Sequence, residues 1–344
     1  MCIYNFNQPK KTLVRQIFRA RLDKVYLKTI VQFHVNDNEN SVSEGDSFMQ
    51  VLNFGSLNID HVYSVPHFVA PGETLSCSSY KVNAGGKGLN QSVALSRAGI
   101  ETAHAGMIGP DGVFLKEILS EAGVDVSNVI SSEIPTGHAV IQVESVHAQN
   151  SILLYPGANM SIPETEMLRI LENCPKGSWL LLQNEINSIP YLIRTGKSCG
   201  LKVAINPAPC TEAVREYPLD LCDLVFVNEI EAAQLADSDS EPGKLADRLT
   251  MLCPNSEIII TLGRDGALYC RGKERIHVPA RQVKAVDTTS AGDTFTGYFL
   301  AARLRGMGVS ESMNLASLAS SITVSRPGAA TSIPFAAEVF PRSI

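Results

Sequence analysis

The 344-residue sequence lacks several features that mark other classes of protein. No apolar run approaches the length needed to span a bilayer, and no signal peptide with a cleavage site is recognisable. The eight cysteines form no C-x-x-C pair and no Cys/His spacing typical of zinc, which favours a reduced, cytoplasmic setting. A net charge of −6 argues against a nucleic-acid-binding surface. We therefore expect neither a membrane nor nucleic acid among the partners.

Two common phosphate-binding motifs are missing as well. The segment NAGGKGLNQ (83–91) is a glycine turn that opens a helix, but Lys87 is followed by Gly88 and not by the Ser or Thr of a Walker P-loop. The segment also lacks the G-x-G-x-x-G spacing of dinucleotide-binding folds, and the seven histidines fall into no metal or triad pattern. The backbone amides of this turn, together with Lys87 and Asn90, are instead suited to a polyhydroxyl ligand.

The composition predicts a folded body preceded by an extension. With 44% apolar residues, the chain can bury the core of one large α/β domain or of two average domains. Residues 1–48 are relatively basic and end in a polar linker. We expect them to form a loosely ordered extension, in which residues 10–31 could form a basic amphipathic helix, and residues 49–344 to form the folded domain. A loosely ordered extension, or an upstream start codon, is favoured over a docking or targeting role.

From Met49 onward, strand and helix patterns alternate, which predicts a mostly parallel sheet with helices on both faces. Two stretches, about 59–84 and 136–156, have strand character with no helix pattern between strands, and we expect them to form a small separate sheet that acts as a lid over the large sheet. The exposed edges of such a lid favour pairing of two subunits into a homodimer. The predicted strands of the large sheet are 51–55, 102–105, 179–183, 202–205, 224–227 and 258–261, and the first predicted helices are 87–98 and one from about residue 112.

Polar residues follow one predicted strand after another. In open parallel sheets, ligands bind at the carboxyl ends of the strands. Each of these residues alone fits a cap or turn residue, but their recurrence on one edge of the sheet predicts a binding site there. They are Asn58, Asp60, Glu185, Asn206, Asn228, Glu231, Thr261 and Asp287.

The segment AVDTTSAGDTF (285–295) is the most informative in the chain. Val283 and Val286 predict a buried strand that runs into a turn of small residues. An amphipathic helix is predicted after the turn, because apolar residues recur there at i, i+3, i+4 and i+7. These helical residues are Phe295, Tyr298, Phe299 and Ala302.

The start of this helix is suited to handling phosphate. Ala291 and Gly292 would present backbone N–H groups without partners to an anion. Asp293 would itself repel a phosphate, so it is better suited to be a base that takes a proton from a hydroxyl attacking the phosphate. The alternative is that Asp293 only caps the helix.

Over about residues 50–335, the sequence motifs resemble those of the ribokinase (PfkB) family of carbohydrate kinases. The resemblance implies a ribokinase-like three-layer αβα sandwich with a mostly parallel central sheet and a small β-sheet lid. It also implies transfer of a phosphoryl group from ATP to a sugar hydroxyl, and the segments TGHAVIQV (136–143) and PGAN (156–159) favour ribose as the sugar. Another sugar or a nucleoside remains an alternative substrate, and a catalytically silent sugar sensor is a second alternative. The motifs are GSLNID (55–60), AGGKGLNQS (84–92), NPAP (206–209), NEIE (228–231), TLGRDG (261–266) and DTTSAGDTF (287–295).

The resemblance also implies roles for individual residues. Asp293 would be the base, and the amides from Ala291 through Gly292 to Asp293 would form an anion hole. The sugar would be held by Asn58, Asp60, Gly86, Lys87, Asn90, Glu185 and Asp293. ATP would be bound by Asn228, Thr261, Leu262, Gly263, Arg264, Asp265, Gly266 and Gly292, with Glu231 organising Mg²⁺. An activating K⁺ would be held by Asp287, Thr289, Thr323, Arg326, Gly328 and Ser332, in several cases through backbone carbonyls.

Three positions depart from the family pattern. Phe114 and Ser290 stand where many relatives have Gly, and Val227 stands where Pro is frequent. None of these departures removes a catalytic group, so they leave the reaction intact and bear mainly on the choice of sugar.

Overall fold

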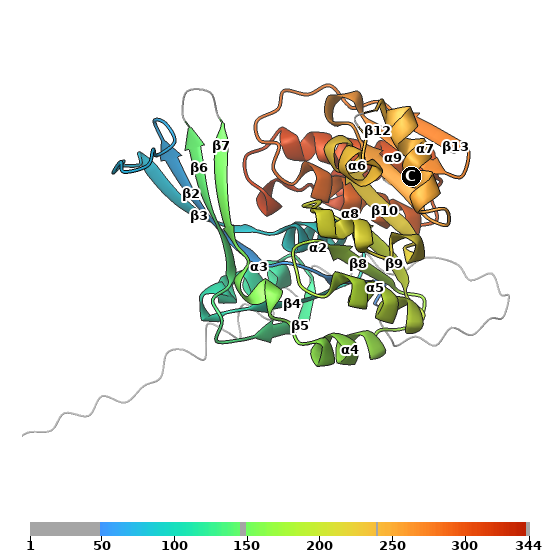
Figure 1. The fold of residues 1–344 in the computed structure, drawn as a ribbon, viewed down its shortest axis with the longest axis horizontal. Helices are drawn as coiled ribbons and strands as arrows, with labels where there is room; N and C mark the ends of the chain where they lie inside the picture. The colour runs from blue at the N-terminus through green and yellow to red at the C-terminus, as the bar shows by residue number, and fades with distance from the viewer. Residues whose placement is uncertain (1–48, 145–148, 239, 342–344) are drawn as a thin grey trace, which may run out of the picture. The chain divides into compact units, whose positions relative to one another are not determined.

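The computed structural model describes residues 49–144, 149–238 and 240–341 (Figure 1). The expectation of a loosely ordered extension over residues 1–48 lies outside the described residues. Two separate sheets and a set of helices make up the described chain. None of the described helices is long and apolar enough to cross a membrane.

The large sheet has nine strands in the order β13-β12-β11-β10-β9-β8-β1-β4-β5. All neighbours from β11 to β5 pair in parallel, and only the β11-β12 and β12-β13 pairs are antiparallel. This confirms the mostly parallel sheet predicted from the alternation of strands and helices. Its strands are β1 (Val51–Phe54), β4 (Thr102–Ile108), β5 (Asp125–Ser131), β8 (Trp179–Gln183), β9 (Lys202–Asn206), β10 (Leu224–Asn228), β11 (Glu257–Thr261), β12 (Ala267–Arg271) and β13 (Glu274–Val278).

Helices cover both faces of this sheet and create two apolar cores. Side chains alternate between the faces of a strand, so Ile258 and Ile260 of β11 pack into one core while Ile259 packs into the other. One core contains residues of α4, α5, α6 and α7, and the other contains residues of α2, α3, α8 and α9. This confirms the three-layer αβα sandwich. The helices are α2 (Lys87–Arg97), α3 (Val113–Glu121), α4 (Glu164–Glu172), α5 (Ile189–Ser198), α6 (Glu229–Ala236), α7 (Pro242–Leu252), α8 (Ala291–Leu304), α9 (Val309–Val324) and α10 (Ala336–Val339).

The small sheet has four strands in the order β3-β2-β6-β7 and stands apart from the large sheet (Figure 1). Its strands β2 (Asn58–Val65) and β6 (Gly137–Glu144) pair in parallel, with β3 (Ser79–Gly85) and β7 (Asn150–Tyr155) antiparallel at the two edges. The prediction of a small separate sheet is therefore confirmed. Because only three residues separate the end of β1 from the start of β2, Asn58 lies where the two sheets meet.

The strand predicted from Val283 and Val286 is wrong. The sheet ends at β13, and the chain from Pro279 to the start of α8 is irregular, so Val283 is 45% and Val286 is 60% exposed. A β-branched residue forms a strand only where a neighbouring strand can accept its hydrogen bonds. The N–H of Val286 instead donates to the carbonyl of Val324 at the end of α9, at 2.7 Å. Asp287 consequently does not follow a strand.

Candidate active site

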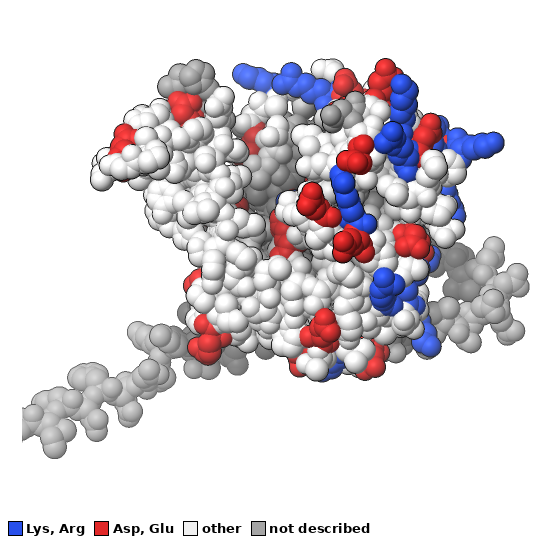
Figure 2. Space-filling view, in the orientation of Figure 1, with Lys and Arg blue, Asp and Glu red and all other residues white. Residues whose placement is uncertain are grey.

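A cleft of about 930 Å³ opens between the small sheet and the carboxyl ends of the large sheet's strands (Figure 2). Its lining combines residues of β2, β6 and β7 with residues that end β9, β10 and β11 and with the start of α8. Parallel strands bring their carboxyl ends to one edge, so residues far apart in the sequence meet there. The cleft lining includes the sequence-predicted residues Asn58, Asp60, Gly86, Lys87, Asn90, Glu185, Asn206, Asn228, Glu231, Thr261, Asp287, Thr289, Ala291, Gly292, Asp293 and Gly328.

Asp293 lies in the first turn of α8, and its carboxylate bonds to the neighbouring helix α2. Each carboxylate oxygen accepts one side-chain amide: Oδ2 from Asn90 Nδ2 and Oδ1 from Gln91 Nε2, both at 3.0 Å. The N-cap position is held by Ser290, so Asp293 is not the N-cap of its helix. Gly292 is exposed, and a methyl group added at its Cα would meet no other atom within 4 Å. The N–H of Ala291 is not without a partner as predicted, because it donates to the carbonyl of Thr288 at 3.4 Å, whereas Gly292 borders open space beside the carboxylate.

The turn before α8 is strained at Ser290. Its φ of 62° lies in the left-handed region, where glycine is favoured and a serine costs energy. Its hydroxyl is buried and has no hydrogen-bond partner among the described residues. This is one of the positions where the sequence departs from the family's usual glycine.

Three carboxyl groups of the cleft, those of Asp293, Asp60 and Glu231, have raised pKa values. Burial raises the pKa of Asp293 to about 6, although the positive charge of Lys87 and the amides of Gln91 and Asn90 oppose the shift. Burial and the nearby Glu185 likewise raise the pKa of Asp60 to about 6. Asp293 is thus ionised at neutral pH, and its affinity for a proton exceeds that of an ordinary aspartate.

Lys87 and Glu185 form an ion pair within the cleft. Lys87 Nζ lies 2.8 Å from Glu185 Oε1, and the backbone N–H of Lys87 donates to Oε2 at 2.9 Å. The glycines around Lys87 permit this packing: Gly86 has a φ of 96°, and a Cβ on Gly88 would lie 2.3 Å from the backbone nitrogen of Ser56. The glycine turn thereby places α2 against the β1–β2 connection.

Asn58 is oriented by a residue that sequence reasoning did not single out. Asn159, only 1% exposed, donates through Nδ2 to Asn58 Oδ1 at 2.7 Å and accepts the N–H of Leu57 at 3.0 Å. With its oxygen engaged, Asn58 has its NH₂ group left for a ligand in the cleft. The PGAN segment (156–159) was the available signal for Asn159, because the resemblance rested partly on it.

The N-x-x-E pair begins α6 as a capping box. Asn228 Oδ1 accepts the N–H of Glu231 at 2.8 Å, and Glu231 Oε2 accepts the N–H of Asn228 at 2.9 Å. Burial raises the pKa of Glu231. Of the expected nucleotide-binding run 261–266, Thr261 lines the cleft, whereas Leu262, Gly263, Arg264, Asp265 and Gly266 form a turn outside its lining.

Most of the residues expected around K⁺ lie on two segments, 287–289 and 326–332, that Asp287 joins, whereas Thr323 lies in the last turn of α9. The carboxylate of Asp287 accepts the N–H of Thr289 at 2.9 Å, the hydroxyl of Thr289 at 2.6 Å and the N–H of Gly328 at 3.0 Å, and these bonds lower its pKa. The remaining three expected residues, Thr323, Arg326 and Ser332, lie outside the cleft lining. The hydroxyl of Thr323 is 3.0 Å from that of Thr294, and the hydroxyl of Ser332 donates to the carbonyl of Ala329. Arg326 forms an ion pair with Glu338. No cluster of three or more His, Cys, Asp or Glu that would bind a metal occurs among the described residues.

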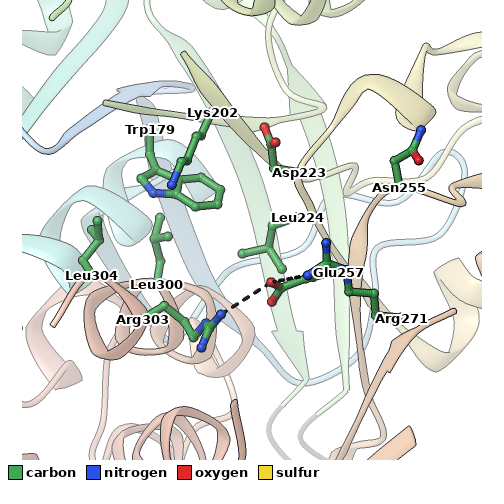
Figure 3. Close-up of a pocket in the computed structure, with 10 residues that line it drawn as sticks. All are labelled: Trp179, Lys202, Asp223, Leu224, Asn255, Glu257, Arg271, Leu300, Arg303 and Leu304. Carbon is green, nitrogen blue, oxygen red and sulfur yellow. Dashed lines mark hydrogen bonds and ion pairs between the residues drawn. The ribbon is translucent and has the colours of Figure 1, made fainter. Parts of the chain in front are cut away.

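A second pocket, of about 390 Å³, lies at the opposite edge of the large sheet, where β8 to β11 begin (Figure 3). Each of its carboxylates is paired with a cation, because Asp223 pairs with Lys197 outside the pocket lining and Glu257 pairs with two arginines of the lining. Glu257 lies 3.5 Å from Arg303 and 3.6 Å from Arg271, as the dashed lines of Figure 3 show. The ammonium group of Lys202 lies 5.6 Å from the centre of the Trp179 ring. This pocket contains no carboxylate next to an open helix N-terminus.

The described fold is similar to that of known sugar kinases. Residues 49–336 match the sequence profile of the pfkB family carbohydrate kinases. Ribokinase of Haemophilus influenzae is 37% identical over 290 residues, which cover 81% of this chain and 94% of that protein. A deoxyribokinase of Salmonella typhi is 30% identical, covering 83% and 96%. The structure of Arabidopsis thaliana ribokinase complexed with ribose and ATP matches with a TM-score of 0.77 at 30% identity, covering 85% of this chain and 97% of that one.

The fold and these matches define an ATP-dependent sugar kinase with the ribokinase-like α/β architecture. The chain belongs to the pfkB family of carbohydrate kinases. The family resemblance inferred from the sequence motifs is therefore confirmed.

Proposed function

We propose that the protein is a ribokinase, which transfers the γ-phosphoryl group of ATP to the 5-hydroxyl of D-ribose and releases D-ribose 5-phosphate and ADP. The observation that carries the proposal is the buried carboxylate of Asp293 next to the open helix N-terminus at Gly292, in a cleft at the carboxyl edge of the sheet. The similarity to ribokinases, one of them solved with ribose and ATP, supports ribose as the substrate.

Asp293 is the general base in this proposal. Its ionised carboxylate accepts the proton of the attacking hydroxyl, and its raised pKa makes it a better acceptor than a solvent-exposed aspartate. The N–H groups of Ala291, Gly292 and Asp293, at the positive end of the α8 dipole, stabilise the charge on the transferred phosphoryl group. The reaction asks the protein mainly for positioning and charge stabilisation.

The sugar is bound on the side of the cleft formed by the small sheet and α2. Asn58 contributes a free NH₂ group, and Glu185 presents carboxylate lone pairs whose charge is balanced by Lys87. Asp60, Asn90 and backbone groups at Gly86 complete the set of hydroxyl partners. Buried hydrogen-bonding groups of this kind discriminate against a sugar that lacks the matching hydroxyl.

ATP and Mg²⁺ occupy the side of the cleft near α6 and α8. Asn228, Thr261 and Gly292 line this side, and the turn at 262–266 flanks it. Mg²⁺ requires few protein ligands when it is held by substrate phosphates, so the single carboxylate of Glu231 fits this role directly or through water. The bound ion would neutralise charge on the phosphates.

K⁺ fits the two loops that Asp287 joins. The carboxylate of Asp287 already accepts three donors, so the ion would be held largely by backbone carbonyls of these loops, and its charge would add positive potential beside the anion hole. Activity should rise several-fold when Na⁺ is replaced by K⁺ at constant ionic strength, and Asp287→Ala should abolish that response. Equal rates in both salts would contradict the K⁺ site and leave the kinase proposal intact.

A homodimer that pairs through the small sheet is the proposed assembly. One face of this sheet lines the cleft, and the opposite face carries exposed apolar side chains, including Tyr80 at 50% and Leu153 at 72% exposure. An apolar surface of this kind favours association. Leu153→Lys should shift the mass measured by light scattering from dimer to monomer. A wild-type monomer would refute the assembly.

A cytoplasmic location is proposed as well, supported by the free thiols of all described cysteines.

A substrate panel tests the proposed reaction. ADP release would be measured with ATP, Mg²⁺, K⁺ and, in turn, D-ribose, 2-deoxyribose, fructose, adenosine and uridine. We expect the highest kcat/KM with D-ribose. The 30% identity with a deoxyribokinase makes 2-deoxyribose the second candidate. A higher kcat/KM with 2-deoxyribose than with D-ribose would make it the proposed substrate. Absence of ADP release with every substrate would favour a silent sugar sensor.

A further inference from the structure

A chain of buried amide side chains connects Asp293 with the interior of the large sheet. Gln91, Gln183 and Asn53 are 0% exposed, and none of them lines the cleft. They occupy α2, β8 and β1, so the chain bridges a helix and two neighbouring strands. Asn206, at the end of β9, joins it from the cleft side. Buried amides rarely gather in this way without a reason beyond packing, because each must find partners for its donors and acceptors.

Backbone carbonyls fix the orientation of the two outer amides. Asn53 Nδ2 donates to the carbonyl of Gly88 at 2.7 Å, and Asn206 Nδ2 donates to the carbonyl of Phe226 at 3.0 Å. A carbonyl can only accept, so the NH₂ group of each Asn must face it. The Oδ1 atoms of both residues therefore point inward, towards the glutamines.

The two central glutamines have only one orientation that satisfies these inward oxygens. Gln183 Nε2 donates to Asn53 Oδ1 at 2.9 Å and to Gln91 Oε1 at 2.8 Å. Gln91 Nε2 then donates to Asn206 Oδ1 at 3.2 Å and to Asp293 Oδ1 at 3.0 Å. A rotated Gln91 amide would place its oxygen against two acceptors and its NH₂ group against the donors of Gln183. The chain therefore forces Gln91 to present an N–H to Asp293.

A glycine makes room for the buried amides, and one amide oxygen left without a partner costs stability. A Cβ on Gly55 would lie 2.2 Å from Gln183 Oε1, so glycine is required beside the amide. Gln183 Oε1 is itself buried without a hydrogen-bond partner in the described part of the chain. An unsatisfied buried acceptor is unfavourable, so Gln183 serves something other than its own hydrogen bonding.

We propose that Gln91, held in one orientation by Gln183, is the positioning residue that fixes the catalytic carboxylate of Asp293; this rests on the proposed role of Asp293 as the base. Asn90 holds the second carboxylate oxygen from the same helix, so the carboxylate is clamped at both ends. Lys87 on α2 and Glu185 after β8 are the charged groups that act on it most strongly. Gln91 acts on the reaction only through Asp293.

The test compares Gln91→Met and Gln183→Glu with the wild-type protein in a D-ribose and ATP assay. Met keeps the length of Gln but cannot donate, and an ionised Glu at 183 cannot donate to Gln91. We expect Gln91→Met to lower kcat by about 10- to 100-fold with little change in the KM for ribose, because the base is misplaced. The acidic limb of its kcat/KM profile should move to higher pH, since one hydrogen bond to the ionised form is lost. Gln183→Glu should change both quantities in the same direction and less strongly.

Ser92→Ala is the matched control. Ser92 is also 0% exposed and belongs to the same network, but its bond with Asn53 leads away from Asp293 towards His104. The Ser92→Ala variant should lower the thermal stability without shifting the pH profile of kcat/KM. A folded Gln91→Met with kcat within twofold of wild type and an unmoved acidic limb would refute the proposal. If Gln91→Met does not fold, an unchanged kcat and pH profile in Gln183→Glu would refute the proposal.

The double variant separates this proposal from the role of Asp293. In an Asp293→Asn background, Gln91→Met should cause no further loss of kcat, because its effect passes through the carboxylate. A full additional loss would show that Gln91 acts elsewhere. If Asp293→Asn alone retains wild-type activity, the base assignment has failed. If Asp293→Asn is inactive and Gln91→Met is unaffected, only the positioning role has failed.

Discussion

The two edges of the large sheet hold their charged groups in opposite ways. At the amino edge, Glu257 lies between two arginines and Asp223 pairs with Lys197 at 2.8 Å, so the carboxylates there are matched by cations. In the cleft at the carboxyl edge, Glu185 pairs with Lys87, but burial raises the pKa of both Asp60, from the small sheet, and Asp293 to about 6. Charges that are kept from water and incompletely matched destabilise the empty protein and are suited to a ligand. The comparison therefore locates chemistry at one edge only.

The topology explains why the edges differ. Along the carboxyl edge, β8, β9, β10 and β11 each end in or lead into a polar residue of the cleft, and α8 turns its N-terminus to the same place. The amino edge receives the ends of helices and the starts of strands, as Leu304 and Trp179 illustrate (Figure 3). Helix N-termini attract anions and helix C-termini do not. An anionic substrate is thus favoured at the carboxyl edge.

The largest expected effect is at the base. Asp293→Asn keeps the shape of the side chain but cannot accept the proton, so kcat should fall by about 10² to 10⁴-fold while ribose and ATP still bind. Steady-state kinetics and calorimetry on the same preparation would check this. A variant that retained a tenth or more of wild-type activity would remove the chemical distinction between the two edges.

The next effect concerns the sugar. Asn58→Ala should weaken D-ribose binding by about 1–3 kcal/mol, the cost of leaving a buried partner unpaired, with ATP affinity little changed. Gln142→Ala is the matched control, because Gln142 belongs to β6 of the same sheet but does not line the cleft. Titration calorimetry with each ligand measures both. Weakened ATP binding with unaltered ribose binding would mean that the two sides of the cleft are exchanged.

A pH dependence follows from the raised pKa of Asp293. The base works only when ionised, so activity is retained above a pH of about 6 and lost below it. Because the pKa of Asp60 is also about 6, protonation of both carboxylates should make kcat/KM fall by up to about 100-fold per pH unit at lower pH, and Asp60→Asn should reduce this to the roughly tenfold fall of a single ionising group. A kcat/KM that stayed constant down to pH 4.5 would contradict a buried carboxylate as the base.

The smallest effect is expected at the amino edge. Arg303→Met removes a partly exposed ion pair with Glu257 and should change the free energy of unfolding by about 1 kcal/mol or less. The kinetic constants for ribose and ATP should be unaltered. Thermal melting and kinetics of the variant would check this, and a change in KM or kcat would connect the pocket of Figure 3 with catalysis.

Local sequence patterns were sufficient where local geometry decides the structure. The helix face of Phe295, Tyr298 and Phe299 was predicted from a period of 3.6, which the backbone imposes on any helix, and the strand 258–261 was predicted from the alternation of strand and helix patterns. The order of the motifs predicted the family, because the residue types alone indicate glycine turns such as 84–88 and the turn before Asp293. The pattern failed at Val283 and Val286, where no neighbouring strand was available.

Contacts across the chain were decided by the tertiary structure alone. Gln91 and Asp293 are 202 residues apart, and only the packing of α2 against α8 brings the amide to the carboxylate. The raised pKa of Asp293 depends on that burial, and so does the clamp formed by Asn90 and Gln91. Sequence by itself determined which residue types were present and which strands and helices they form. Which of those residues meet, and hence how acidic each one is, depended on long-range packing, because burial and charge proximity are properties of the folded molecule.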